Sequence, residues 1–403
     1  MNYLSVCCIA KDEHPFIKEW IHHHLLVGAE KIIIFDNESS PSLRISLREY
    51  IEHGFVDLIE IQGQEQQMAA YDQCLRDYEK KSKWIAFIDV DEFLIPKKSE
   101  DVRLILTDYE DFGGLGVHWV EFGSSGHLTR PRRKQLSSYT QRFPLDYPKN
   151  MHIKSIVQPG RVKSSCDPHR FIYNEPWFCV DENCFPLAES RGPFTAKHIQ
   201  LNHYYYRSHE DYCKKIERGR ADRSDEAGRR RSDAFFWQLD KATTHDDFAQ
   251  KFEKKSELLL DDFESLKIFV QNREDEKKDT KTYYNLVLKN ISLGKIDTAK
   301  HLIKKICICE SKKEIIDYIN FEIYKSKNDK YNALKYLYRV FQRQTDYNSC
   351  IDYAELKISM KHIDDAKSMI SYIRSRFHEV LKADKKKSEY IKKIAEEADA
   401  RQN

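Results

Sequence analysis

The chain has 403 residues, which is enough for two or three domains. It is 40% hydrophobic and 33% charged, as expected of a globular protein with well-filled cores. The formal net charge is only +2, so the sequence lacks the basic excess typical of proteins dedicated to binding nucleic acid.

The sequence predicts neither a leader segment nor a membrane span. The N-terminus reads MNYLSVCCIAKDE and lacks basic residues ahead of a long apolar run, so it does not resemble a signal peptide. No apolar run approaches the roughly eighteen residues of a transmembrane helix. The ten cysteines show no paired CxxC spacing, and Cys7, Cys8 and Cys74 lie in apolar segments. These features favour the reducing cytoplasm, with peripheral contact at the cytoplasmic membrane as an option.

The first ninety residues alternate between strand-like and helix-like segments. Continuous apolar runs predict strands at 4–10, 31–35, 56–61 and 84–88, and helical spacing predicts helices at 16–26, 43–53 and 66–80. Continuous apolar strands that alternate with helices are typical of a parallel sheet covered on both faces. The sequence therefore predicts an α/β fold for this part of the chain.

Three of the predicted strands end in polar or acidic clusters. These clusters are Lys11-Asp12-Glu13, Asp36-Asn37-Glu38-Ser39 and Asp89-Val90-Asp91-Glu92. In parallel sheets, ligands bind beyond the carboxyl ends of the strands. The sequence therefore predicts a ligand site at this edge of the sheet.

The third cluster, in the stretch WIAFIDVDEFLIP, has a high energetic cost. Burying each of these carboxylates costs several kcal/mol, and they also repel one another. In an extended segment, residues two apart share a face, so Asp89 and Asp91 can converge on one point. Carboxylates placed in this way either share a proton or bind a hard cation such as Mg²⁺ or Mn²⁺.

The remaining chain changes character twice. From Gly113 to about Tyr206 it predicts short strands joined by Gly- and Pro-rich loops, followed by a helix at 208–219. From Asp240 onward it contains one glycine, no proline, and many Lys, Glu, Leu and Ile residues, which favours helices throughout. We predict an α/β domain at residues 1–240 and an all-α domain at residues 241–403.

The helical segment contains a weak repeat. Alanines recur about 34 residues apart, and a large aliphatic residue follows four positions after each of them. The pairs are Ala299 with Ile303, Ala333 with Leu337, and Ala366 with Ile370. This spacing resembles that of tetratricopeptide helix pairs. An ordinary helical bundle with a chance period is the alternative.

Four segments in order resemble the motifs of glycosyltransferase family 92 and of family-2-like bacterial glycosyltransferases. They are KDEHPFIKEWIHHHLLVGAEKIIIFDNES, WIAFIDVDEF, FGSSGH and LNHYYYRSHEDYCKKIERG, and the resemblance covers roughly residues 3–220. It implies a GT-A fold, a Rossmann-like domain that binds a nucleotide sugar. It also implies a divalent cation, Mn²⁺ or Mg²⁺, and inverting transfer from a UDP-sugar, which in several members is UDP-galactose. The C-terminal helices lie outside the resemblance.

The resemblance assigns the metal site to the DxD element Asp89-Val90-Asp91. It implies that Asp91 binds the metal that bridges the donor diphosphate, and that Asp89 faces the ribose or a metal-bound water. It also makes His203 a third metal ligand. His169 is a competing ligand, and a packed core histidine is the alternative interpretation of His203.

The resemblance also assigns contacts with the donor nucleotide. The strand-end residues approach the nucleoside, and the basic and hydroxyl residues of the late motif bind phosphate. These residues are Lys11, Glu13, Asp36, Asp89, Arg207, Ser208, Lys215 and Arg218. For Lys215 and Arg218, solvated surface charge is the alternative.

Inversion requires a carboxylate that deprotonates the acceptor hydroxyl. Glu210 and Asp211 of the late motif are the preferred candidates for this base, and Glu121 and Asp167 are the alternatives. The loop 123–127 is expected to line the acceptor side.

Two further groups of residues allow both a structural and a functional interpretation. Trp119 is either a platform for a sugar ring or a core residue. The run Arg229-Arg230-Arg231, followed by Phe235-Phe236-Trp237, is either a basic and aromatic edge that contacts lipid or a phosphorylated acceptor, or an interdomain linker.

The leading prediction is a cytoplasmic, metal-dependent, inverting hexosyltransferase. It would transfer a hexose, with galactose favoured, from a UDP-sugar to a glycan acceptor in surface polysaccharide or lipopolysaccharide synthesis. Its helical domain could contact the inner membrane or a partner protein.

Two alternatives stay open. A nucleotidyltransferase is disfavoured because AKDEHPF contains no Gly-rich phosphate loop. A catalytically inactive GT-A domain on a helical-repeat scaffold is disfavoured because Asp89, Asp91, His203 and Arg207 are all present.

Overall fold

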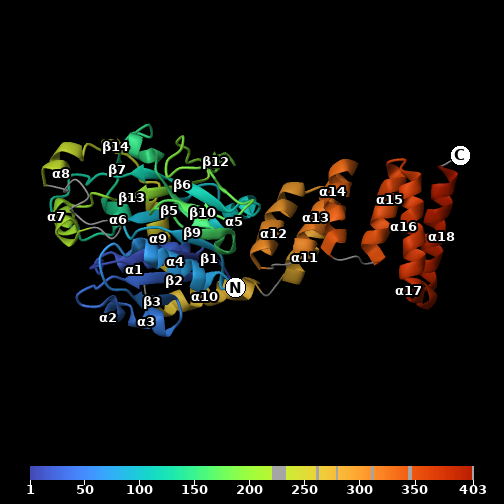
Figure 1. Cartoon of the computed structure of the whole chain (residues 1–403), viewed down its shortest axis with the longest axis horizontal. Coiled ribbons are helices and arrows are strands. Elements are labelled where there is room, and N and C mark those ends of the chain that lie inside the picture. The colour runs from blue at the N-terminus through green and yellow to red at the C-terminus, as the bar shows by residue number, and fades with distance from the viewer. Residues whose placement is uncertain (220–232, 260–262, 278–279, 310–312, 344–346, 402–403) are drawn as a thin grey trace. The chain divides into compact units, whose positions relative to one another are not determined.

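The structure is a computed structural model that describes residues 1–219, 233–259, 263–277, 280–309, 313–343 and 347–401 (Figure 1). The chain divides into two compact units, Met1–Arg273 and Glu274–Asn403. Each unit is described by itself. No helix in the described part of the chain is both long and apolar enough to cross a bilayer.

A mixed β-sheet forms the centre of the first unit and has ten strands within the described residues (Figure 1). Eight strands follow one path in the order β12 (Pro186–Leu187), β11 (Cys179–Val180), β6 (Gly114–Glu121), β8 (Ile153–Val157), β4 (Ser82–Phe87), β1 (Asn2–Ala10), β2 (Lys31–Asp36) and β3 (Val56–Glu60). Off this path, β13 (Ile199–His203) runs parallel to β6 and antiparallel to β5 (Glu92–Pro96). Two small antiparallel pairs join β9 (Val162–Ser165) to β10 (Phe171–Tyr173) and β7 (Gln141–Arg142) to β14 (Thr244–His245).

The N-terminal strands β3, β2, β1 and β4 run parallel to one another, which confirms the predicted α/β fold. Ala10 at the end of β1 pairs with Asp36 at the end of β2, and Cys7 pairs with Phe87 at the end of β4. The segments that follow these three strands therefore meet at one edge of the sheet.

Strands β1, β2 and β4 are buried on both faces along nearly their whole length, whereas the edge strand β3 is only partly buried. Helix α4 (Gln67–Tyr78) covers one face, where its Tyr71 and Cys74 pack against Cys7 and Phe87. Neighbouring side chains such as Cys8 point to the opposite face and are also fully buried. Helix α1 (Ile17–Leu26) packs against β2 and β5. The apolar runs are unbroken because neither face of these strands meets water.

The predicted helix at residues 43–53 consists of two short helices, α2 (Leu43–Ser46) and α3 (Arg48–Glu52). Leu47, between them, leaves helical geometry with φ −108° and ψ 11°. The other helices of this unit are α5 (Val102–Leu106), α6 (Gln135–Ser138), α7 (His209–Arg218), α8 (Asp233–Leu239), α9 (Gln250–Leu259) and α10 (Phe263–Lys277).

The first unit continues beyond the predicted boundary between residues 240 and 241. Helix α9 packs against α1 and α6, and its Phe252 is buried. Phe263 of α10 lies 5.3 Å, centroid to centroid, from the ring of Tyr50 and 5.8 Å from that of Phe55. These aromatic contacts place residues up to Arg273 in the first unit. The segment predicted to be helical also contains a short strand, β14.

Helices joined by short turns make up the described residues of the second unit, as predicted. Consecutive helices pair as α11 (Thr280–Ser292) with α12 (Ile296–Cys309), α13 (Lys313–Ser326) with α14 (Lys330–Arg343), and α15 (Tyr347–Ser359) with α16 (Ile363–Arg376). Helices α17 (His378–Ala383) and α18 (Lys385–Ala400) follow.

The repeat lies on the second helix of each pair. Its alanines, Ala299, Ala333 and Ala366, are fully buried. The turn five residues before each alanine has positive φ, at Gly294 (70°), Asn328 (58°) and Lys361 (64°). Helix pairs with this period are therefore present, whereas a tetratricopeptide architecture stays a prediction.

A partly buried carboxylate joins α1 to α6. Glu19 of α1 accepts hydrogen bonds from the backbone nitrogens of Gln135 (2.9 Å) and Leu136 (3.2 Å). Burial raises the pKa of Glu19 from 4.5 to about 7, with Glu253 adding to the rise, although these two donors and Lys134 oppose it. The folded state therefore binds a proton at Glu19 that the unfolded chain has already released between about pH 4.5 and 7.

We predict that Glu19→Gln removes this part of the pH dependence. Because the pKa is higher in the folded state, ionisation of Glu19 lowers the free energy of unfolding as pH rises from about 4.5 to 7, by on the order of 2 kcal/mol. Urea unfolding at pH 5 and pH 8 should show a smaller loss of stability for Glu19→Gln than for the parent. An equal loss of stability in the parent and in Glu19→Gln would contradict a protonated Glu19 in the folded state.

Candidate active site

The acidic segment 89–92, which follows β4, is hydrogen-bonded to helix α1. The indole Nε1 of Trp20, on α1, donates to the backbone carbonyls of Asp89 (3.1 Å) and Glu92 (2.9 Å). Within the segment, Asp91 is 7% exposed and Glu92 is fully buried. Buried carboxylates need partners, and the partners come from distant parts of the chain.

Asp91 lies among three cationic side chains. Its Oδ2 accepts a hydrogen bond from Nζ of Lys215, on α7, and lies 3.8 Å from Nε2 of His203. Burial alone would raise the pKa of Asp91, but Lys215, His203 and Arg207 hold it well below its ordinary value. Asp91 is therefore an ionised carboxylate inside the protein.

His203 is oriented by a second buried carboxylate. It ends β13 and pairs with Glu121, the last residue of the neighbouring strand β6. Nδ1 of His203 donates to Oε2 of Glu121 at 2.7 Å. Burial would lower the pKa of His203, but Glu121 and Asp91 raise it above the ordinary value. The bond fixes the ring so that Nε2 faces Asp91, an arrangement typical of metal-binding histidines.

The geometry of Asp91 and His203 fits one divalent cation. Two ligand atoms that each lie about 2.1 Å from an ion are at most about 4.2 Å apart, and Oδ2 of Asp91 and Nε2 of His203 are 3.8 Å apart. A carboxylate oxygen is a ligand that Mg²⁺ and Mn²⁺ favour, whereas an imidazole nitrogen is more typical of a transition-metal ion. Lys215 contacts the same oxygen of Asp91, so a cation would compete with the ammonium group.

Asp89 has a different set of partners. Its Oδ2 accepts from Nζ of Lys154 at 2.9 Å, and its Oδ1 accepts from Nε2 of Gln67 at 3.1 Å. The backbone nitrogen of Asp89 donates to Oε2 of Glu92 at 2.7 Å. The structure thus brings Asp91 to His203 and brings Asp89 to Lys154.

Lys154 is a site residue that the sequence reasoning missed. It is the second residue of β8, is 1% exposed, and its Nζ is also 3.6 Å from Oε2 of Glu92. Asp89 and Glu92 raise the pKa of Lys154 despite its burial, so it is a buried cation. Burial raises the pKa of Glu92 to about 7, although Lys154 opposes this shift. A lysine inside the apolar strand IKSIV was the available signal.

Arg207 joins the first strand-end cluster to the DxD element. Its backbone has φ +49°, a left-handed conformation that non-glycine residues rarely adopt. Its guanidinium donates to Glu13 (2.8 Å), to the carbonyl of Val90 (3.1 Å) and to Oε1 of Gln135 (2.8 Å). Arg218 binds the other oxygen of Glu13 at 2.7 Å. Two of the predicted phosphate residues, Arg207 and Arg218, therefore bind Glu13 at this edge.

Three other predicted nucleotide contacts lie on the same edge. Lys11 is partly exposed, with its Nζ 3.9 Å from Glu38. Asp36 is buried and accepts from the backbone nitrogen of Leu43 at 2.9 Å. Ser208 is fully buried and caps α7, accepting from the backbone nitrogen of Asp211 at 3.2 Å. A phosphate contact by Ser208 would require this cap to open.

The predicted bases lie on the first turn of α7 and have other partners. Glu210 accepts from Nζ of Lys214 at 2.6 Å and from the backbone nitrogen of Arg130 at 3.0 Å. Asp211 accepts from the guanidinium of Arg130 at 2.6 Å and from the hydroxyl of Ser208 at 2.6 Å. Their role as the catalytic base stays a prediction.

Trp119 lies in the wall of the site beside His203. Its Nε1 donates to Oε1 of Glu92 at 2.7 Å, and its ring centroid is 4.2 Å from that of His203. The competing ligand, His169, lies 5.1 Å from the Trp119 ring, and its Nδ1 hydrogen-bonds the carbonyl of Ile153 at 2.8 Å. Burial, with Lys154 nearby, lowers the pKa of His169 to about 4. These contacts place His203 next to Asp91 and His169 behind Trp119.

The loop 123–127 is fixed by a residue from the far end of the first unit. A Cβ atom on Gly123 would lie 2.4 Å from Oδ1 of Asp240, so only glycine fits this close approach. The backbone nitrogen of Ser124 donates to the same oxygen at 2.9 Å. The loop is therefore part of the packed structure beside β6.

Of the basic run 229–231 and the aromatic run 235–237, the structure describes only the aromatic run. Arg229-Arg230-Arg231 lies outside the described residues. In α8, Phe236 is buried against Tyr206 and Tyr212, whereas Trp237 is 55% exposed. One of these aromatic residues is thus part of the core.

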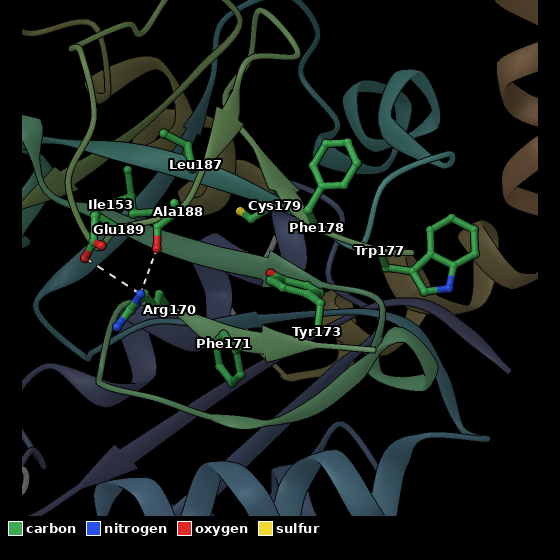
Figure 2. A pocket seen from close by; sticks show the side chains of 10 residues that line it. All are labelled: Ile153, Arg170, Phe171, Tyr173, Trp177, Phe178, Cys179, Leu187, Ala188 and Glu189. Atoms are coloured by element: carbon green, nitrogen blue, oxygen red, sulfur yellow. Dashed lines mark hydrogen bonds and ion pairs between the residues drawn. The ribbon is translucent and has the colours of Figure 1, made fainter. Parts of the chain in front are cut away.

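A separate pocket lies between the β9–β10 hairpin and strands β11 and β12 (Figure 2). Figure 2 shows that Tyr173, Phe178 and Trp177 line it and that Arg170 and Glu189 meet at its other end, 3.7 Å apart. Its volume of about 210 Å³ is below the range of about 300–1,000 Å³ that is typical of small-molecule sites. We assign no substrate to it.

Residues 3–243 match the family model "Glycosyltransferase family 92". This match covers more than half of the chain and includes the strand-end clusters, the DxD element and His203. The chain belongs to glycosyltransferase family 92. The match ends close to the predicted boundary at residue 240 and before the end of the first compact unit.

Curated relatives carry the same family name. A glycosyltransferase family 92 protein of Oryza sativa subsp. japonica is 27% identical over 166 residues, which is 40% of this chain and 28% of the relative. Relatives in Ricinus communis (26% over 222 residues) and Arabidopsis thaliana (25% over 229 residues) each align with 53% of this chain and 37% of their own length. The chain thus spans about a third of these curated relatives.

We predict that Lys154→Met strongly destabilises the first unit. The substitution keeps most of the side-chain volume but leaves Asp89 and Glu92 without their buried cation, which costs about 3 kcal/mol or more. Urea unfolding at pH 7.5 would measure the loss. Lys163→Met, which removes an exposed lysine from the adjacent hairpin, should change the stability by less than about 0.5 kcal/mol. Equal effects of the two changes would show that Lys154 does not compensate the acidic segment.

Proposed function

We propose that the protein is a metal-dependent glycosyltransferase that transfers a hexose from a UDP-sugar to a glycan acceptor. One observation supports the proposed metal dependence. Oδ2 of Asp91 lies 3.8 Å from Nε2 of His203, whose Nδ1 is held by Glu121. A buried, ionised carboxylate beside an oriented imidazole is a binding site for a divalent cation. Membership of family 92 supports the transferase activity.

A GT-A arrangement is part of this proposal. Strands β4, β1 and β2 run parallel and bring Asp91, Glu13 and Asp36 to one edge of the sheet. Ligands of open α/β sheets bind at this edge. A nucleoside would lie beside Glu13 and Asp36, and its diphosphate would extend toward Asp91 and His203.

The electrostatics of this edge favour a diphosphate that carries a bound cation. Mn²⁺ or Mg²⁺ would screen the phosphate charge and stabilise the leaving nucleotide. The chain itself supplies Lys215 beside Asp91 and Arg207 and Arg218 beside Glu13. Lys215 contacts the same oxygen of Asp91 that would bind the cation, so its ammonium group would be in position to contact a phosphate oxygen.

The finer parts of the proposal rest on the family resemblance. Transfer with inversion and a preference for UDP-galactose come from that source. The curated relatives are plant proteins, and they give no support to a lipopolysaccharide acceptor. We therefore propose a glycan acceptor and place it on the side of Trp119, whose ring lies against His203.

Asp91→Asn should abolish Mn²⁺-dependent binding of UDP. The amide keeps the shape of the side chain but removes the charge that binds the cation, so we expect the Kd of UDP with Mn²⁺ to rise at least tenfold. Calorimetric titration of UDP in the presence of Mn²⁺, and separately of EDTA, would measure this change. Asp77→Asn, which alters an exposed aspartate on α4, serves as the control and should leave the Kd unchanged.

The same proteins, assayed for slow hydrolysis of UDP-sugars, test the activity. The parent protein should release UDP from one donor in a hexose panel, and Asp91→Asn should not. Equal binding of UDP and Mn²⁺ by Asp91→Asn would refute the assignment of the site. Metal-dependent binding of UDP without turnover of any donor or transfer to any acceptor would favour an inactive domain on a helical scaffold.

A further inference from the structure

A second group of metal-binding side chains lies outside the candidate active site. Nε2 of His209, Sγ of Cys213 and a carboxylate oxygen of Asp233 all lie within 4.8 Å of one another. Among the described residues, this is the one set of three or more His, Cys, Asp or Glu side chains that meets this criterion. His209 and Cys213 lie in the late motif of the resemblance, but neither the resemblance nor the predicted nucleotide site assigns a role to these three residues.

Two helices present the three ligand atoms to one another. His209 and Cys213 are four residues apart on α7, so their side chains lie on the same face of the helix. Asp233 is the first residue of α8, which packs on α7 through Phe236 and Tyr212. The core contacts of the two helices therefore hold Asp233 opposite the His209–Cys213 face.

Neighbouring aromatic side chains fix the orientation of the ligands. The indole Nε1 of Trp237 donates to Oδ2 of Asp233 at 3.3 Å, which leaves Oδ1 directed at His209 and Cys213. The ring of His209 lies 4.9 Å from that of Trp237 and 4.8 Å from that of Phe236. Metal sites depend on such outer contacts to orient their ligands.

The two distances from the thiol sulfur suit a small thiophilic cation, whereas Nε2 of His209 and Oδ1 of Asp233 are in direct contact and would move apart when they bind it. Around tetrahedral zinc, with Zn–S of about 2.3 Å and Zn–N or Zn–O of about 2.1 Å, a sulfur lies about 3.6 Å from the other ligand atoms. Sγ of Cys213 is 3.7 Å from Nε2 of His209 and 3.9 Å from Oδ1 of Asp233. His209 and Asp233 are hydrogen-bonded to each other, and a cation would replace the shared proton.

We propose that His209, Cys213 and Asp233 bind one Zn²⁺ ion, with water in the fourth position. The soft thiolate distinguishes this site from the oxygen and nitrogen pair of Asp91 and His203. Binding deprotonates the Cys213 thiol and links α8 to α7. Because α7 also carries Lys215 and Arg218, the zinc ion braces the helix that brings these cations to the acidic edge.

Cobalt substitution in the full chain tests the thiolate ligand. Protein stripped of metal and titrated with Co²⁺ should develop the near-ultraviolet thiolate-to-cobalt charge-transfer band, saturating at one equivalent. Zn²⁺ should then remove the band. Cys213→Ser should abolish the band, whereas Cys184→Ser, which alters another exposed cysteine, should retain it. Absence of the band from the parent, or its persistence in Cys213→Ser, would overturn the proposal.

Two carboxylate variants test the rest of the site and separate it from the candidate active site. Asp233→Asn should weaken Zn²⁺ binding at least tenfold in competition with a chromophoric chelator, whereas Asp91→Asn should leave both the band and the zinc affinity unchanged. An unchanged affinity for Zn²⁺ in Asp233→Asn would show that the carboxylate of Asp233 is not a ligand. Loss of the band in Asp91→Asn would show that the cobalt binds at the acidic edge instead.

Discussion

The cost of burying the carboxylates after β4 governs the organisation of the first unit. Asp91 and Glu92 lie inside the protein at the end of an apolar strand, where an ionised group without a partner costs several kcal/mol. Lys154 reaches this segment from β8, and Lys215 reaches it from α7. The acidic segment is therefore stable only when the chain has brought these distant elements to the edge of the sheet.

The same charges support the proposal that this edge binds a nucleotide diphosphate. Among the cations that offset the buried carboxylates, Lys215 lies beside Asp91, where the diphosphate would bind. Asp91 has a second possible partner besides Lys215, because His203 is turned toward it by Glu121. A divalent cation that enters between Asp91 and His203 would release Lys215 toward the phosphates. Under this proposal, stability without a nucleotide and binding of a nucleotide would depend on the same side chains.

Local signals in the sequence predicted much of this fold. The apolar runs located β1 to β4, and the polar residues that follow them marked the edge where the site lies. Partners far apart in the chain were not predictable in this way: Glu13 and Arg207 are 194 residues apart, and nothing near Lys154 in the sequence indicates Asp89. The alanine period predicted the helix pairs, but Lys361 carries no local preference for its positive φ. The predicted boundary near residue 240 assigned α9 to the helical domain, because only tertiary packing shows that this helix belongs to the first unit.

The central claim is that Asp91 and His203 share one divalent cation, and pulsed electron paramagnetic resonance of bound Mn²⁺ tests it most directly. With one Mn²⁺ per chain and UDP present, the account predicts a hyperfine coupling to a single histidine nitrogen. The coupling should disappear in His203→Gln and persist in His169→Gln. A coupling that survives in His203→Gln, or that disappears only in His169→Gln, would contradict the claim.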